Sequence, residues 1–179
     1  MGQDVAQTSP DGATCTLDHT LYEISLDNHR FKLWEVSSIA PMNYFRRLFA
    51  KWRLKRSYNK LYKDDGVYLL LYCMRNSRAH GTLVKDYKFF TSIVGSTAGH
   101  VPVAAVVTHL EDYPSKMNDW WEKNEQNLRH QGMQFSRHAC ITSLPDDQDA
   151  SPALHARRWL SEQVIRRLIL DDYQAGRAS

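Results

Sequence analysis

A short, continuous apolar run at residues 101–107 stops abruptly at polar side chains. An apolar run without alternation is typical of a strand covered on both faces, as in a parallel sheet between layers of helices. The polar residues Thr108, His109, Glu111 and Asp112 lie just after the run. Because ligands of open α/β sheets bind outside the carboxyl ends of the strands, these residues are the first candidates for a binding site. The same residue types also suit the simpler task of ending a strand and starting a turn.

The beginning of the chain predicts a lead-in followed by a hairpin. Residues 1–19 contain few large apolar groups, and we expect them to form a flexible lead-in. Residues 20–26 and 29–35 alternate between apolar and polar positions, as strands do. Asp27 and Asn28, which separate them, are a two-residue turn signal. We therefore expect an antiparallel β-hairpin near the edge of a sheet.

The rest of the chain alternates between helical and strand patterns. Helices are expected over residues 41–63, 82–94, 114–132 and 152–173, and further strands over residues 67–74, 101–107 and 133–141. The last helix has Ser151 as its expected N-cap and Pro152 at its first position. This order predicts an α/β fold with a mostly parallel sheet, an N-terminal antiparallel hairpin and helices on both faces. We expect residues 20–174 to form a single domain and residues 175–179 a polar tail.

The first of these helices is strongly basic. Eight Arg and Lys residues lie between its apolar positions, and no acidic residue occurs between Glu35 and Asp64. A solvated face on a packed helix accounts for this pattern. Contact of residues 46–63 with an acidic membrane, with nucleic acid or with an acidic protein partner is the alternative account.

Composition excludes several other classes of protein. The chain has 179 residues, 42% hydrophobic and 24% charged, which is typical of one globular domain. Its net charge of +3 is too small to indicate nucleic-acid binding by itself. Cys15, Cys73 and Cys140 are widely spaced, so neither a zinc site nor a disulfide framework is indicated. A reduced, cytoplasmic protein is therefore expected. No apolar run is long enough to span a bilayer, and the histidines lack metal-site spacing.

Polar residues follow three of the predicted strands, at Glu35, at Thr108–Glu111 and at Thr142–Ser143. Together with the order of elements, this pattern resembles the G domains of GTPases from their second strand onward. It is most similar to the septin-like, immunity-associated branch and to related fungal G-domain proteins, over roughly residues 12–172. The resemblance implies a P-loop NTPase-like fold without its first strand. It also implies GTP or GDP as the ligand, with magnesium.

The resemblance assigns roles to residues at four motif positions. Thr16 matches the first-switch threonine that binds magnesium. Glu35 and Ser38 stand at the Asp and Gly of the second-switch motif Asp-x-x-Gly. In the base-reading motif Asn/Thr-Lys-x-Asp the chain has Thr108, His109 and Glu111, and in the last motif, Ser-Ala-Lys, it has Thr142 and Ser143. A glutamate still accepts hydrogen bonds from guanine, although its extra methylene displaces the carboxylate.

The largest departure from the family is the missing phosphate loop. No Gly-x-x-x-x-Gly-Lys-Ser/Thr occurs in the chain, although that loop supplies the backbone amides and the lysine that hold the phosphates. The missing strand would lie between the hairpin and residues 67–74, which leaves two strand edges without a neighbour. Three explanations are open. An upstream part of a longer protein supplies the missing strand, a partner protein supplies it, or the two strand edges pair directly with each other.

Three functions therefore remain open. The first is a degenerate guanine-nucleotide-binding domain with weak binding and little or no hydrolysis. The second is a pseudo-GTPase that acts as a protein-interaction or self-association module. The third is a binder of acidic membranes or nucleic acid through residues 46–63.

Overall fold

The computed structural model describes residues 19–36, 44–64, 66–76, 80–95, 101–113, 115–143 and 151–178. The chain divides into two compact units, residues 1–50 and residues 51–179.

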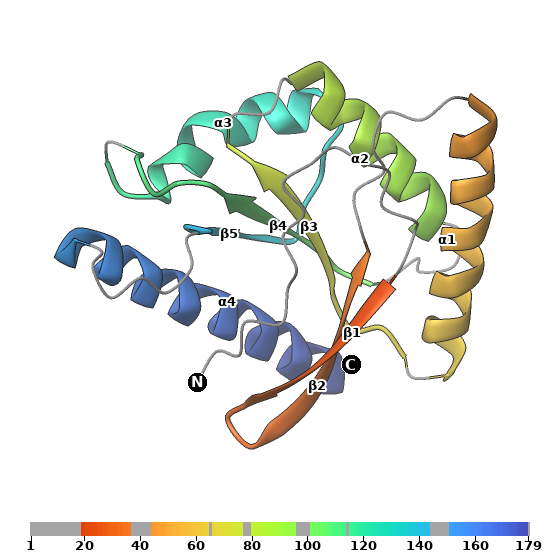
Figure 1. Cartoon of the computed structure of the whole chain (residues 1–179), viewed down its shortest axis with the longest axis horizontal. Coiled ribbons are helices and arrows are strands. Elements are labelled where there is room, and N and C mark those ends of the chain that lie inside the picture. The colour runs from red at the N-terminus through yellow and green to blue at the C-terminus, as the bar shows by residue number, and fades with distance from the viewer. Residues whose placement is uncertain are drawn as a thin grey trace. The chain divides into compact units, whose positions relative to one another are not determined.

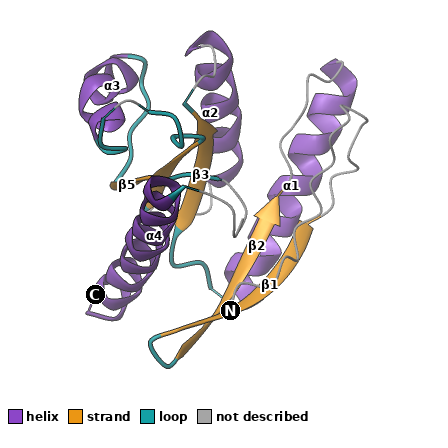
Figure 2. Ribbon diagram, turned by 60° about the vertical axis from the view of Figure 1, so that its left-hand side comes forward, coloured by secondary structure: helices purple, strands orange, loops and turns teal. Residues whose placement is uncertain are grey.

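The first unit contains the predicted hairpin. Strands β1 (His19–Leu26) and β2 (His29–Val36) pair antiparallel, with Leu26 opposite His29 next to the turn. They form a two-stranded sheet of their own, drawn as the orange ribbon pair in Figure 2. Asp27 and Asn28 have φ values of 44° and 66°. A two-residue turn that matches the strand twist needs such left-handed residues, and Asp and Asn tolerate them. The predicted hairpin is confirmed.

The remaining elements alternate between helix and strand, as the sequence predicts. They are α1 (Tyr44–Asp64), β3 (Leu70–Arg75), α2 (His80–Val94), β4 (Val103–Thr108), α3 (Asp119–His130), β5 (Arg137–Cys140) and α4 (Pro152–Ala178). The basic stretch is one helix, which runs across the boundary between the two units.

Several predicted element ends are confirmed by their local hydrogen bonds. The Oγ of Ser151 accepts a hydrogen bond from the backbone N–H of Leu154 at 3.4 Å, which makes Ser151 the N-cap of α4. Gly132 has a φ of 82° directly after the C-cap of α3. The N–H of Met133 then donates to the carbonyl of Leu128 at 3.0 Å, so the left-handed glycine ends α3 as expected.

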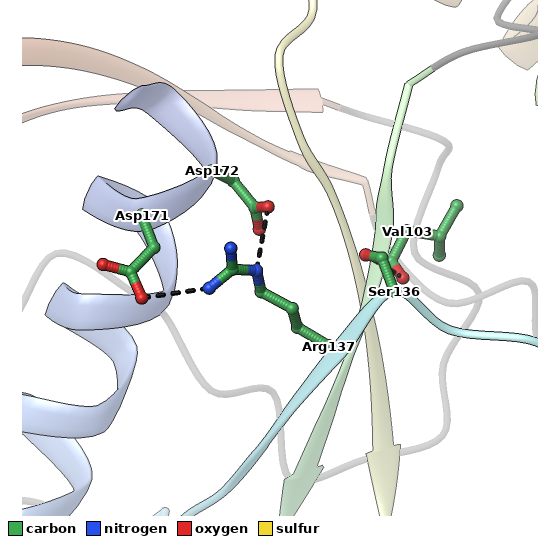
Figure 3. Close-up of polar contacts among 5 residues, drawn as sticks. All are labelled: Val103, Ser136, Arg137, Asp171 and Asp172. Carbon is green, nitrogen blue, oxygen red and sulfur yellow. Dashed lines mark hydrogen bonds and ion pairs between the residues drawn. The ribbon is translucent and has the colours of Figure 1, made fainter. Parts of the chain in front are cut away.

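Other boundaries differ from the prediction. Helix α3 starts at Asp119 instead of near residue 114, and β5 is shorter than the predicted residues 133–141. Helix α4 continues to Ala178, so most of the expected polar tail is helical. Just before the tail, Arg137 of β5 forms ion pairs with Asp171 at 2.9 Å and Asp172 at 3.2 Å, as Figure 3 shows. These ion pairs join the end of α4 to a strand more than 30 residues upstream, and the helix continues past them.

Strands β3, β4 and β5 form a parallel sheet in consecutive order. Helices α2 and α3 pack on one face of this sheet and α4 packs on the other (Figure 1). Right-handed crossovers that step in one direction place their helices on the same face, which explains why α2 and α3 lie together. The structure therefore confirms an α/β fold with a three-stranded parallel sheet between helices and a separate antiparallel hairpin.

The centre of the sheet is β4, which is buried on both faces. Ala104, Ala105 and Val107 are 0% exposed, and Val106 is 3% exposed. Ala105 and Val107 belong to the cluster under α2 and α3, whereas Ala104 belongs to the cluster under α4. The run without alternation at residues 101–107 is thus a doubly covered strand, as predicted.

An aromatic cluster fills the space between the sheet and helices α2 and α3. The hydroxyl of Tyr87 donates to the carbonyl of Gln134 at 2.7 Å and accepts from its N–H at 3.1 Å. The ring of His138 stacks on Trp121, with centroids 4.4 Å apart and planes at 4°. Burial lowers the pKa of His138, and the nearby carboxylates Glu125 and Glu122 oppose this shift only in part.

Among the helices that the structure describes, none is both long and apolar enough to cross a membrane.

Replacing Leu128 with alanine tests the core. Leu128 is 1% exposed under α3, so we expect Leu128→Ala to lower the free energy of unfolding by about 2–5 kcal/mol. Urea denaturation measures this change. The matched control is Leu160→Ala on α4, where the side chain is 46% exposed and we expect a change within about 0.5 kcal/mol. Equal costs at the two positions would contradict the assigned core.

Acidification tests the environment of His138. The pKa of His138 is lower in the folded chain than in the unfolded chain. There is therefore a pH range in which His138 binds a proton in the unfolded chain but not in the folded chain. This contribution to stability is present above the ordinary histidine pKa of about 6.5 and is lost as the pH falls below it. We expect His138→Phe, which keeps the stacking on Trp121, to lose less unfolding free energy than the wild type between about pH 7.5 and pH 5.5. Identical pH dependence in both proteins would show that His138 is not the group responsible.

Candidate functional site

Strand β4 ends at Thr108, and the chain then leaves the sheet abruptly. The Oγ1 of Thr108 donates to the carbonyl of Met74 on β3 at 3.3 Å and lies 2.9 Å from Nδ1 of His109. His109 has a φ of 63°, a left-handed conformation that costs energy in any residue other than glycine. The strained residue and the hydroxyl contacts together fix the direction in which the following loop leaves the sheet.

The loop after β4 meets the end of β5 through side chains. The Oγ1 of Thr142 donates to Oε2 of Glu111 at 3.3 Å. The backbone N–H of Thr142 donates to Oγ of Ser161 on α4 at 3.0 Å, and Thr142 is only 7% exposed. Ser143 follows it and is exposed. One half-buried carboxylate is therefore fixed at the carboxyl edge of the sheet, next to a buried hydroxyl.

Arg157 of α4 holds the same loop, a role that no sequence pattern indicates. Its Nη1 donates to the carbonyls of Leu110 at 2.7 Å and Glu111 at 2.8 Å. Its Nη2 donates to the carbonyls of Tyr113 at 2.7 Å and Ser115 at 3.2 Å. The flat guanidinium carries five N–H donors in a fixed geometry, so four convergent carbonyls fit it well. We call this group of contacts the Arg157 clamp.

A second side chain on α4 extends the clamp. Ser161 is 6% exposed, and its Oγ donates to the carbonyl of Arg157 at 2.8 Å while accepting from the N–H of Thr142. Residues 157 and 161 lie one helical turn apart, so a single face of α4 contacts both the β4 loop and the end of β5. The position of Glu111 is thus set by α4 as well as by its own strand.

The structure brings together four of the predicted site residues. Thr108, His109 and Glu111 lie at the end of β4, and Thr142 lies at the end of its neighbour β5. Ser143 is the next residue after Thr142 in the sequence. The shared edge was predicted, because parallel neighbours end on the same side of a sheet.

The other three predicted residues belong to the first unit. Glu35 lies on β2 in the first unit, where its Oε2 accepts a hydrogen bond from the hydroxyl of Tyr22 at 3.0 Å. That bond is the main reason for the raised pKa of Tyr22. Thr16 and Ser38, the predicted switch residues, lie outside the described residues.

The chemistry available at this edge is binding by hydrogen bonds. A carboxylate and a buried hydroxyl offer acceptors to a ligand that carries N–H groups. Within the described ranges, no group of three or more His, Cys, Asp or Glu is arranged to hold a metal ion. Cys140 ends β5 nearby in the sequence, but burial raises the pKa of its thiol to about 12. The thiol therefore stays protonated at neutral pH and is a poor nucleophile.

Removing the guanidinium tests the Arg157 clamp. Arg157→Gln leaves several loop carbonyls without their donor, so we expect the free energy of unfolding to fall by about 2–4 kcal/mol. We also expect faster amide hydrogen exchange in residues 110–113. Arg167→Gln is the control, because Arg167 is an exposed arginine on the same helix and its loss should cost no more than about 0.5 kcal/mol. Equal effects of the two changes would contradict the clamp.

Comparisons with known proteins add no family assignment to this geometry. The chain matches no protein-family model. A comparison with curated protein sequences likewise gives no significant match.

Proposed function

We propose that the chain is a degenerate guanine-nucleotide-binding domain of the G-domain type, with weak binding and little or no hydrolysis on its own. The observation that carries the proposal is the position of Glu111. Its carboxylate lies at the carboxyl edge of a parallel sheet, bonded to Thr142, in a loop that the Arg157 clamp holds. That edge is where open α/β sheets bind their ligands.

The arrangement of the second unit supports the proposal. Parallel strands in consecutive order with helices on both faces agree with what the resemblance to G domains implies for this part of the chain. Topology alone does not specify a ligand, since one fold supports many functions. The proposal therefore depends on the side chains at the strand ends.

Guanine suits the carboxylate of Glu111. Its N1–H and its exocyclic N2 amino group are adjacent donors, and a carboxylate has two oxygens with about four acceptor positions. The hydrogen bond from Thr142 occupies one of these and helps to orient the group. Adenine presents an acceptor at N1, so the same carboxylate disfavours it. The exposed Ser143 and the half-buried His109 are the neighbouring groups proposed to contact the base.

The phosphates have no comparable partner. The sequence has no phosphate loop, so the backbone amides and the lysine that usually supply much of the affinity are not encoded in it. Thr16, Glu35 and Ser38 remain proposals for the magnesium and phosphate end. The proposed function therefore rests on recognition of the base.

A second candidate function is favoured by the same contacts. Glu111 is already bonded to Thr142, and the carbonyls of its loop are bonded to Arg157, without any ligand. An edge held by these internal hydrogen bonds also suits a pseudo-GTPase that presents a rigid surface to another protein. Capture of a stable protein partner that is unaffected by GTP supports this alternative, whereas strict dependence on nucleotide contradicts it.

Titration with GTP and ATP, followed by amide chemical shifts, tests the proposed base recognition. We expect GTP to shift residues 108–112 and 142–143 with a Kd of roughly 0.1–1 mM, and ATP to bind more weakly. Glu111→Gln replaces one carboxylate oxygen with an NH₂ donor, which would face the N–H donors of guanine. We therefore expect the affinity for GTP to fall about tenfold or more, so that the preference for GTP over ATP disappears.

The matched control is Glu162→Gln, which changes an exposed carboxylate on α4 and should leave both affinities unchanged. If GTP produces no shifts at these residues, guanine recognition at this edge is wrong. A Kd in the low micromolar range that depends on magnesium would overturn the expectation of weak binding.

A further inference from the structure

The second half of α1 has two different faces. Tyr58 is 9% exposed and packs with Ile93 and Val94 of α2, together with Leu54. Trp52 is 57% exposed. At about 100° per residue, Trp52 lies on the other side of the helix from Leu54 and Tyr58. The apolar face of α1 is therefore already used for packing, and the exposed tryptophan belongs to its outer face.

Trp52 is not an isolated exposed residue. The guanidinium of Arg56 lies over its ring, with Cζ 5.6 Å from the ring centroid. Lys55 and Asn59 join these two residues in lining a surface hollow of about 240 Å³. Positions 52, 55, 56 and 59 have the spacing of neighbours on one helical face. The hollow thus combines an aromatic plane, two cations and an amide.

Positive charge continues along this face toward the end of α1. Lys60 and Lys63 are exposed, and no acidic residue interrupts the sequence before Asp64. We call the set Trp52, Lys55, Arg56, Asn59, Lys60 and Lys63 the Trp52 stripe. At 1.5 Å per residue it is about 16 Å long, which accommodates a few consecutive nucleotides. The net charge of the whole chain is only +3. The clustering of positive charge on this face of α1 is therefore a more specific indication of an anionic partner than the net charge is.

We propose that the Trp52 stripe binds single-stranded nucleic acid, with a base stacked on Trp52 and backbone phosphates on its Lys and Arg residues. An aromatic plane beside cations is the combination that proteins use for unpaired nucleotides. The amide of Asn59 adds hydrogen bonding at the edge of a base. This proposal is independent of guanine-nucleotide binding at the sheet edge.

An acidic membrane fits the same surface less well. A helix that lies in a bilayer interface inserts an apolar face, but the apolar face of α1 packs against α2. Between residues 51 and 64 the outer face carries one exposed indole among Lys and Arg side chains, which is not the continuous apolar face that an interfacial helix inserts.

The test is fluorescence anisotropy with a labelled oligouridine of about twelve nucleotides. We expect Trp52→Ala to weaken binding by about 5- to 150-fold, the range that loss of one stacked base corresponds to. The control is Trp159→Ala on α4, where the indole is 63% exposed and binding should be unchanged. Equal affinity of Trp52→Ala and Trp159→Ala overturns the proposal.

Salt dependence tests the phosphate contacts separately. The double change Lys60→Gln and Lys63→Gln should reduce the slope of log K against log salt by about 1.4, since each phosphate contact on a single strand contributes about 0.7. The matched control is Lys116→Gln with Arg167→Gln, which also removes two exposed charges but lies outside the stripe. An equal reduction in both double variants shows nonspecific attraction and overturns the proposal.

Two further probes distinguish other occupants of the stripe. Vesicles of phosphatidylcholine and phosphatidylserine should bind with no dependence on Trp52. If Trp52→Ala loses vesicle binding and keeps oligouridine binding, the occupant is a membrane and the proposal fails. A duplex of the same length should bind more weakly than the single strand, because its bases are not free to stack on Trp52. Equal binding of duplex and single strand also overturns the proposal.

Discussion

Burial of β4 on both faces is the constraint from which the rest of the second unit follows. A strand whose side chains are 0–3% exposed needs a helix layer on each side and a hydrogen-bonded strand on each edge. Helices α2 and α3 supply one layer, α4 supplies the other, and β3 and β5 supply the edges. The polar residues Thr108, His109 and Glu111 begin where this buried run ends, so we expect any binding chemistry of β4 at its carboxyl end.

The Arg157 clamp turns that end into a defined surface. A loop with several unpaired carbonyls is normally mobile, because water satisfies its backbone as well as the protein does. A guanidinium that bonds carbonyls from Leu110 to Ser115 removes much of this freedom. The carboxylate of Glu111 is therefore positioned before any ligand arrives, which lowers the entropic cost of binding. The same rigidity also suits a surface that binds another protein. Nucleotide binding and protein binding, the two proposed functions of this edge, therefore depend on the same contacts of Arg157 and Glu111.

The Trp52 stripe depends on a different physical situation. Helix α1 uses Tyr58 and Leu54 for packing against α2, whereas Trp52 lies on its outer face and is 57% exposed. Exposed charge on a helix is ordinary, but a tryptophan covered by a guanidinium beside a hollow is not explained by solubility. The two proposed sites use different elements and different chemistry, and neither depends on the other.

The sequence by itself determined the order and type of the elements, because hydrophobic periodicity and local turn chemistry are properties of neighbouring residues. The hairpin turn at Asp27 and Asn28, the N-cap at Ser151 and the stop at Gly132 are local signals of this kind. It also placed Thr108, Glu111 and Thr142 at one edge, since the ends of parallel strands coincide. Its element boundaries were less accurate at the start of α3 and at the end of α4.

Only the tertiary structure decided how the edge is held together. The hydrogen bond between Thr142 and Glu111 joins residues 31 positions apart, and Arg157 reaches carbonyls more than 40 positions upstream. An arginine on an amphipathic helix is ordinarily solvated, and no spacing in the sequence distinguishes Arg157 from its neighbours. The distinction arises because packing of α4 against the sheet brings one guanidinium opposite several carbonyls. Local patterns encode helices and strands, but such convergence exists only once they are packed.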